Sequence, residues 1–132
     1  MKLTIKGELT DLNTYIQKER GNRFAAAAIK EEETRRVYWE CKSQKIKRID
    51  DPVFIACMWF CKNKKKDKDN ISFSKKFILD GLVKAGVLEN DGWEQVVGFQ
   101  DSFVVDKENP RVEVELNVLN KTSFSKIFFA KS

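Results

Sequence analysis

The stretch "PVFIACMWFC", residues 52–61, decides the fold. Apolar residues occupy both alternating sets of positions in this segment, which is the pattern of a central strand covered on both faces. The stretch leads directly into "KNKKKDKDN", residues 62–70, where Asp67 and Asp69 stand inside a run of lysines. We therefore expect a buried strand that delivers a highly charged segment to one edge of a sheet.

The flanking elements follow from the same periodicities. Alternating apolar and polar residues predict three more strands, at residues 2–9, 96–105 and 111–119. Apolar residues that return every three or four positions predict helices at residues 12–43 and 71–85, the second closed by Gly86. Gly21 leaves open whether the first segment is one helix or two. The expected fold is α+β, with a mixed β-sheet packed with helices in a single domain over residues 1–132.

Charge indicates the kind of partner. Lys and Arg exceed Asp and Glu by 25 to 20, and the sequence pI is about 9.1. Between residues 42 and 84 there are eleven Lys and one Arg against five Asp, so the excess is concentrated in the middle of the chain. This favours an anionic partner such as DNA. The longest apolar runs fall short of the roughly 20 residues of a membrane span, and the start "MKLTIKGELT" does not resemble a signal peptide. We therefore expect a cytoplasmic protein without membrane association.

The absence of certain residue types limits the catalytic mechanisms that the protein can use. The chain contains no histidine, which excludes Ser-His-Asp and Cys-His nucleophile systems and imidazole general bases. The three cysteines, Cys41, Cys57 and Cys61, are too few for a structural zinc site without histidine, and they are expected to be reduced and to pack in the core. Any catalyst must rely on carboxylates, lysine and a bound metal ion.

Two carboxylates inside a lysine run need an explanation. Each acid repels the phosphates that the lysines attract. A divalent cation would convert the pair into a phosphate anchor, whereas the alternative is a solvated loop in which neighbouring charges offset one another. A further acid, Asp91 in "VLENDGW", can approach Asp67 and Asp69 only through tertiary folding.

These residues carry a family resemblance. "KKKDKDN" followed by "SKKFILDGLVKAGVLENDGWEQV" resembles the RusA family of Holliday junction resolvases. In that family an Asp-x-Asp-Asn element, a helix ending in Asp-x-Leu-x-x-Ala-Gly and an acidic pair occur in this order. The resemblance runs over residues 53–119 and is weaker in the N-terminal half. Asn90 stands where many members carry the first acid of the pair.

The resemblance implies a function and a set of site residues. The implied activity is metal-dependent endonucleolytic resolution of four-way DNA junctions by a homodimer, in DNA recombination and repair. The implied ligands for Mg²⁺, with Mn²⁺ as an alternative, are Asp67, Asp69 and Asp91. Lys76, four residues before Asp80, is the implied active-site lysine, and Lys75 is the alternative for this role. The residues expected to contact DNA are Lys62, Lys64, Lys65, Lys66, Lys68 and Lys75.

Two other functions remain open at this point. One is a non-catalytic DNA-binding accessory protein, and the other is a metal-dependent nuclease of flaps or forks with little junction selectivity.

The roles of several individual residues also remain open. Trp59 is expected in the core, as buried aromatics usually are, and Trp93 beside Asp91 is a candidate for base stacking. Asp101 lies on an otherwise apolar strand face, either beyond the buried sheet or near the metal. The terminal Phe124, Phe128 and Phe129 are expected to cover the core or to form a dimer contact.

Overall fold

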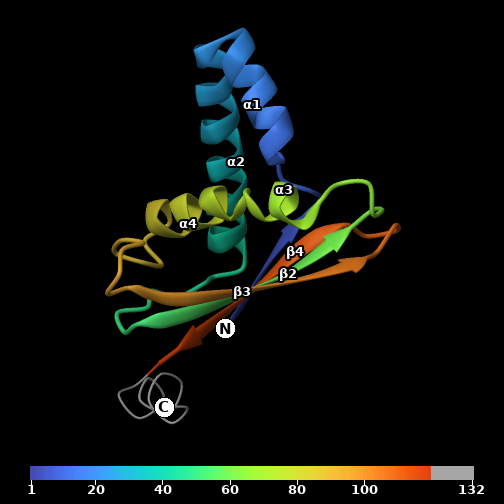
Figure 1. Ribbon diagram of the computed structural model, residues 1–132. Coiled ribbons are helices and arrows are strands. Elements are labelled where there is room, and N and C mark those ends of the chain that lie inside the picture. Colours follow the sequence, from blue (N-terminus) through green and yellow to red (C-terminus); the bar gives the residue numbers. More distant parts are fainter. Residues whose placement is uncertain (120–132) are drawn as a thin grey trace, which may run out of the picture.

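The computed structural model describes residues 1–119. The predicted terminal element with Phe124, Phe128 and Phe129 lies outside the described residues. Figure 1 shows a sheet with helices above it, one pair of which rises away from the sheet. In chain order the elements are β1 (Lys2–Lys6), α1 (Leu12–Gly21), α2 (Arg23–Ser43), β2 (Val53–Cys61), α3 (Lys68–Ser72), α4 (Lys75–Lys84), β3 (Val96–Val105) and β4 (Arg111–Val118).

The sheet is mixed, as the sequence predicts. Its strand order is β1-β4-β2-β3, with β2 parallel to β3 and antiparallel to β4, and with β1 antiparallel to β4. The α3–α4 segment forms the crossover that a parallel β2–β3 pair requires. The α+β class is therefore confirmed, and the predicted strands are found, although β1 ends three residues early at Lys6.

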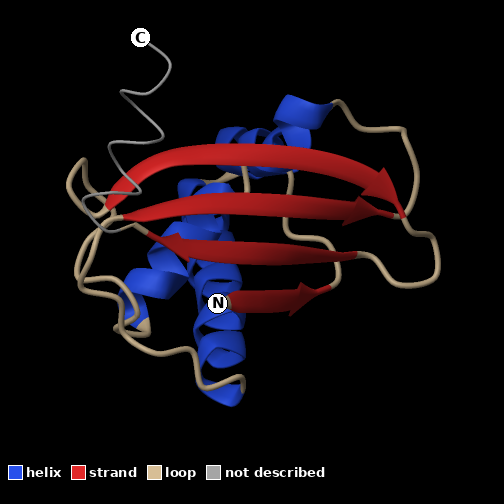
Figure 2. Ribbon diagram, turned by 90° about the horizontal axis from the view of Figure 1, so that it is seen from below, coloured by secondary structure: helices blue, strands red, loops and turns tan. Residues whose placement is uncertain are grey.

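Helices cover only one face of the described sheet, as Figure 2 shows from the opposite side. On β2 the buried residues that face the helices alternate with residues that face the other side of the sheet. The latter are only partly covered, and Met58 among them is 37% exposed. The prediction that both faces of this strand are covered is therefore wrong for the described part of the chain. Its reason is topological, because α2 and the α3–α4 crossover lie on the same side of the sheet. The buried positions of β2 are Val53, Ile55, Cys57, Trp59 and Cys61.

Both predicted helical segments are divided. The first breaks at Asn22, one residue beyond Gly21, because the extended backbone of Asn22 ends α1. The side-chain oxygen of Asn22 accepts a hydrogen bond from Phe24 N and thereby caps α2. The second divides into α3 and α4 at Phe73 and Ser74. The buried Ser74 hydroxyl donates to the Ile71 carbonyl at 2.9 Å, which satisfies the end of α3.

Two glycines fix α4 against its neighbours. A Cβ at Gly81 would lie 2.4 Å from the Val37 side chain, so only glycine allows α4 and α2 to approach this closely. Gly86 has φ +77° and ends α4 in the left-handed conformation, as predicted from the sequence. The start of α4 lies against β3, where Lys75 Nζ is 2.6 Å from Asp101 Oδ2.

The three cysteines are reduced and pack in the core, as the sequence predicts. All three are free and buried. Burial raises the pKa of Cys57 to about 12 and that of Cys41 to about 11, so both thiols stay protonated at neutral pH. Trp59 lies in the core as expected, whereas Trp39 and Trp93 are exposed. Among residues 1–119 the longest helices are too polar or too short to cross a membrane.

Candidate active site

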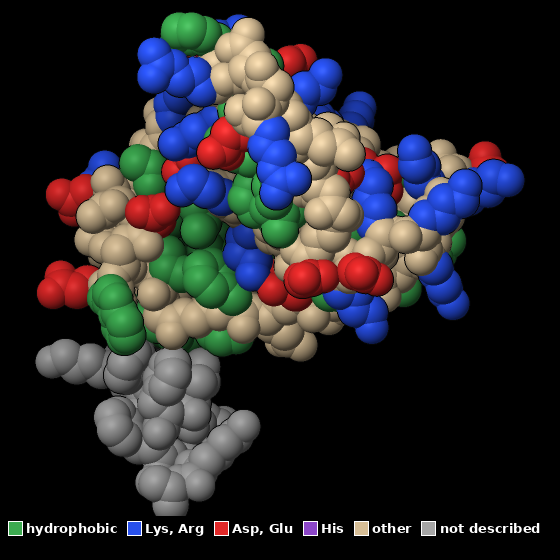
Figure 3. Space-filling model, turned by 45° about the horizontal axis from the view of Figure 1, so that its top comes forward, with side chains coloured by type: hydrophobic (Ala, Val, Ile, Leu, Met, Phe, Trp, Pro, Cys, Tyr) green, Lys and Arg blue, Asp and Glu red, His purple; other side chains and the backbone are tan. Residues whose placement is uncertain are grey.

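The charged segment after β2 lines an open groove at one end of the sheet. The groove has a volume of about 790 Å³, and its walls come from the β2–α3 segment and from the last residues of β3. Figure 3 shows Lys and Arg side chains gathered at this end of the molecule. The lining includes Lys64, Lys66, Asp67, Lys68, Asp69, Ile71, Phe103, Val104 and Val105.

Asp67 and Asp69 are both exposed and both line this groove. Asp67 precedes the first residue of α3 but makes no side-chain capping hydrogen bond, and Asp69 lies in the first turn. Within the described chain neither carboxylate accepts a side-chain hydrogen bond or forms an ion pair, although lysines surround both of them in the sequence. Two free carboxylates are suitable oxygen ligands for a hard divalent cation.

The five lysines of this segment divide into two groups. Lys64, Lys65 and Lys68 are exposed and have no acidic partner among residues 1–119, so they are free to contact phosphates. Lys62 lies 3.9 Å from Glu8, and Lys66 forms a 2.8 Å ion pair with Asp11. The second group therefore ties the groove to the β1–α1 connection.

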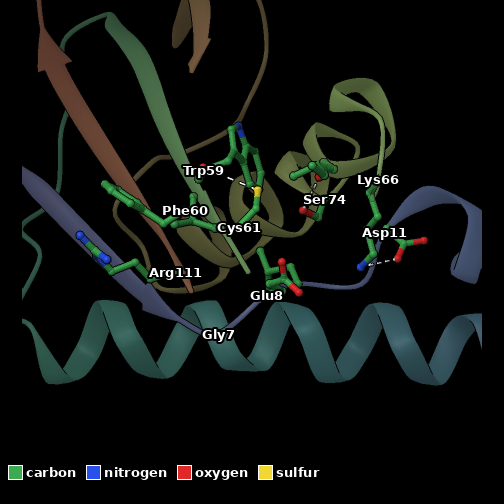
Figure 4. Close-up of a pocket in the computed structure, with 12 residues that line it drawn as sticks. Gly7, Glu8, Asp11, Trp59, Phe60, Cys61, Lys66, Ser74 and Arg111 are labelled. Atoms are coloured by element: carbon green, nitrogen blue, oxygen red, sulfur yellow. Dashed lines mark hydrogen bonds and ion pairs between the residues drawn. The ribbon is translucent and has the colours of Figure 1, made fainter. Parts of the chain in front are cut away.

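Asp11 is the anchor of this connection, as Figure 4 shows beside a small cavity of about 20 Å³. Its Oδ1 accepts from Thr14 N at 2.8 Å and caps α1. Burial raises the pKa of this carboxyl, but the hydrogen bonds from Lys66 and Thr14 outweigh burial and hold the pKa below its usual value. The same contact raises the pKa of Lys66.

We expect the Asp11→Ala variant to lose stability, by about 0.5–2 kcal/mol for the missing cap alone. Because the folded-state pKa of Asp11 is lowered, the stabilisation is present above the unfolded-state pKa and is lost as pH falls through the folded-state value. The difference in urea unfolding between parent and variant should therefore be fully present at pH 7 and should shrink as pH falls below the ordinary pKa of an aspartate, about 3.9. A difference that stays constant over this pH range would contradict the assigned ion pair.

Asn70, the last residue of the Asp-x-Asp-Asn element, has a role that the sequence did not reveal. Its side chain is buried and its Oδ1 accepts a hydrogen bond from Asn13 N at 2.9 Å. The amide thus holds α3 against the start of α1, so this part of the motif positions the segment that carries Asp67 and Asp69.

Asp101 proves to be part of a polar cluster between β3 and α4. Its Oδ2 lies 2.6 Å from Lys75 Nζ, and its Oδ1 accepts from Trp59 Nε1 at 2.8 Å. The Lys75 ammonium also lies 4.5 Å from the centre of the Phe99 ring. Asp101 is two residues from Phe103, a groove residue on the same face of β3, so this cluster adjoins the groove.

The structure distinguishes between the two candidates for the active-site lysine, Lys75 and Lys76. The Lys75 side chain is 17% exposed and already paired with Asp101, which limits its part in DNA contact. Lys76 is exposed and has no carboxylate partner in the described range. Asp80 lies one turn further along α4, 3.9 Å from Lys30 of α2, in a position that suits a structural role.

Asp91 does not join the other two acids within one chain. It precedes β3, whereas Asp67 follows β2, and the two strands are parallel with Val53 opposite Val96 and Cys61 opposite Val105. Nine residues of strand separate the two ends by roughly 26 Å. Asp91 and Trp93 are both exposed, Trp93 at 97%. Accordingly, among residues 1–119 there is no cluster of three acidic or thiol side chains that could hold a metal ion.

An α+β domain with an open groove lined by exposed lysines has the features of a protein that binds nucleic acid. The chain matches the family of Endodeoxyribonuclease RusA over residues 9–117, and it belongs to this family. The family comprises endonucleases that act on Holliday junctions in DNA recombination. The match to this family confirms the resemblance seen in the sequence. The match includes α1 and α2, which the sequence motifs did not cover. No curated protein matches the chain.

Proposed function

We propose that this protein is a divalent-metal-dependent, homodimeric endonuclease that resolves four-way DNA junctions by paired phosphodiester hydrolysis. The observation that carries this proposal is the groove at the end of β2, where Asp67 and Asp69 stay free of protein partners among exposed lysines. The family membership supports the substrate class. A DNA substrate in turn supports a cytoplasmic site of action.

Each group of residues has a distinct task. Lys64, Lys65 and Lys68 attract the DNA backbone into the groove. Asp67 and Asp69 would hold Mg²⁺ or Mn²⁺, which as a Lewis acid supplies charge stabilisation at the scissile phosphate. Lys76 neutralises charge that builds on the phosphate oxygens or the leaving group. Lys75 is kept in place by Asp101 and adds positive potential beside the groove.

The separation of Asp91 supports the homodimer. A two-fold axis perpendicular to the β2–β3 strands places the Asp91 end of one copy beside the Asp67 end of the other. β3 suits such pairing, because it is an edge strand of ten residues without lysine or proline. In this arrangement each copy contributes Asp91 to its partner's groove, and the dimer presents two equivalent sites to two DNA strands.

The proposal is tested by cleavage of a labelled four-way junction, compared with duplex and flap substrates of the same sequence, in Mg²⁺ and in EDTA. We expect junction cleavage in Mg²⁺ alone, with cuts on opposed strands. Equal cleavage of flaps and junctions would favour the nuclease with little junction selectivity. Tight junction binding without any cleavage would favour the accessory protein, a function that the separation of Asp91 within one chain also allows.

The double variant Lys64→Ala, Lys65→Ala should weaken the salt dependence of junction binding. Both side chains are exposed and have no acidic partner in the described chain, so each can release counterions when it binds a phosphate. The slope of log K against log salt should become shallower by about 0.9 for each phosphate that the variant no longer neutralises. Titrations at several salt concentrations measure this slope, and an unchanged slope would place the DNA elsewhere. Lys2→Ala is the control, because this exposed lysine lies on β1, at the opposite edge of the sheet from β3.

A further inference from the structure

The upper part of the α1–α2 hairpin has no part in the site described above. Figure 1 shows that this hairpin rises from the helical layer, away from the sheet. α1 has no fully buried residue, and every residue from 17 to 24 is exposed. The buried residues of α2 are Ala26, Glu33, Val37 and Cys41, so most of its packing lies below the tip. The fold alone therefore gives no reason for the side chains at the tip.

The tip holds an aromatic ring in water. Phe24 is 71% exposed, and the Arg23 guanidinium lies 5.2 Å from the centre of its ring. The turn is fixed by Asn22, whose N–H donates to the Lys18 carbonyl at 2.8 Å and whose side chain caps α2. Three and four residues further along, Ala27 and Ala28 are exposed on the same face of α2. The ring is thus presented on a rigid turn beside small side chains that allow close approach.

The charge of the tip indicates an anionic partner. Among the exposed residues 17–24 there are three cations, Lys18, Arg20 and Arg23, against one acid, Glu19. None of the three cations forms an ion pair within residues 1–119. Figure 3 shows Lys and Arg side chains along this hairpin as well as at the groove end. An aromatic ring flanked by cations is the combination that proteins use to bind unstacked nucleotides.

The hairpin also lies within reach of DNA in the groove. Asn70 and Lys66 hold the start of α1 against the segment that carries Asp67 and Asp69. α1 has ten residues, so the tip lies roughly 15 Å further along the helix axis. That length corresponds to about four or five nucleotides of one strand.

We infer that the hairpin tip is a second DNA contact, in which Phe24 stacks on a base that has left the duplex stack near the junction, while Arg20 and Arg23 hold the neighbouring phosphates. The inference rests on the proposed function, because the DNA in the groove brings the strand to the tip. Charge complementarity favours a nucleotide over a second copy of the chain as the occupant of the tip.

The test compares Phe24→Ala with the control Trp39→Ala, which removes an exposed aromatic residue lower on α2. Removal of one base-stacking ring should weaken binding of a four-way junction in EDTA by about 5- to 150-fold. The salt slope should stay unchanged, whereas the double variant Arg20→Ala, Arg23→Ala should make it shallower. The control should bind like the parent.

A fluorescent adenine analogue, 2-aminopurine, locates the contact. Placed about four to five nucleotides from the cleavage position, it should change its fluorescence with the parent protein and not with Phe24→Ala. Parental affinity and an unchanged signal in Phe24→Ala would overturn the inference while leaving the proposed function intact. Sedimentation showing that Phe24→Ala disrupts a dimer would also overturn it, since the tip would then contact protein. A parent that neither binds nor cuts junctions would refute the proposed function and this inference together.

Discussion

The Asp69→Asn variant is expected to lose junction cleavage by at least about 100-fold while it keeps the fold. The substitution preserves the shape of the side chain and removes one of the two free negative charges in the groove. Asp69 has no side-chain hydrogen bond or ion pair within residues 1–119, so its replacement breaks neither. Single-turnover cleavage of a labelled junction in Mg²⁺ measures the loss.

Junction binding in EDTA should respond in the opposite direction. A carboxylate that repels the DNA backbone is gone, so the affinity of Asp69→Asn should equal or exceed that of the parent. Asp67→Asn and Asp91→Asn should show the same pattern. Glu32→Gln is the matched control, because it removes one charge from an exposed site on α2 and should leave both properties unchanged. Much weaker binding by Asp69→Asn, or cleavage at the parental rate, would contradict the catalytic assignment.

A mixture of two inactive variants is expected to regain activity. Asp69→Asn and Asp91→Asn alter residues at opposite ends of the β2–β3 pair. If Asp91 acts in the partner's groove, a mixed dimer carries one groove in which both carboxylates are intact. Random exchange of subunits should then restore about a quarter of the parental sites, and these should nick the junction without paired cuts.

The mixing experiment distinguishes two arrangements. If all three acids acted within one chain, the mixed dimer would contain no intact site and the mixture would stay inactive. Mixing Asp67→Asn with Asp69→Asn is the control, because these residues lie in the same groove and the mixture should stay inactive in either arrangement. Recovery in the control or its absence in the test pair would contradict the shared site.

The fold was largely predictable because periodicity reports burial. The alternating pattern of β4 and the apolar run of β2 indicated the strands, and Gly86 indicated the end of α4. The predicted cover on both faces of β2 failed because apolar content does not reveal on which side the crossover helices lie. The division between α3 and α4 was missed because Ser74 is a local hydrogen-bonding feature inside an apolar pattern.

The candidate site was predictable only where it is local in the sequence. Asp67, Asp69 and the surrounding lysines are contiguous, and the structure places them together in one groove. The pairing of Lys75 with Asp101 joins residues that are far apart in sequence and depends on how α4 packs against β3. The distance of Asp91 likewise follows from strand direction, which composition and spacing do not encode.

The most direct test of the metal site is diffraction from crystals of the full chain soaked in Mn²⁺, recorded so that the anomalous signal of manganese is visible. We expect an anomalous peak at coordination distance from the carboxylate oxygens of Asp67 and Asp69, with Asp91 of a second copy approaching the same peak. A peak remote from Asp67 and Asp69, or the absence of any peak at saturating Mn²⁺, would contradict it.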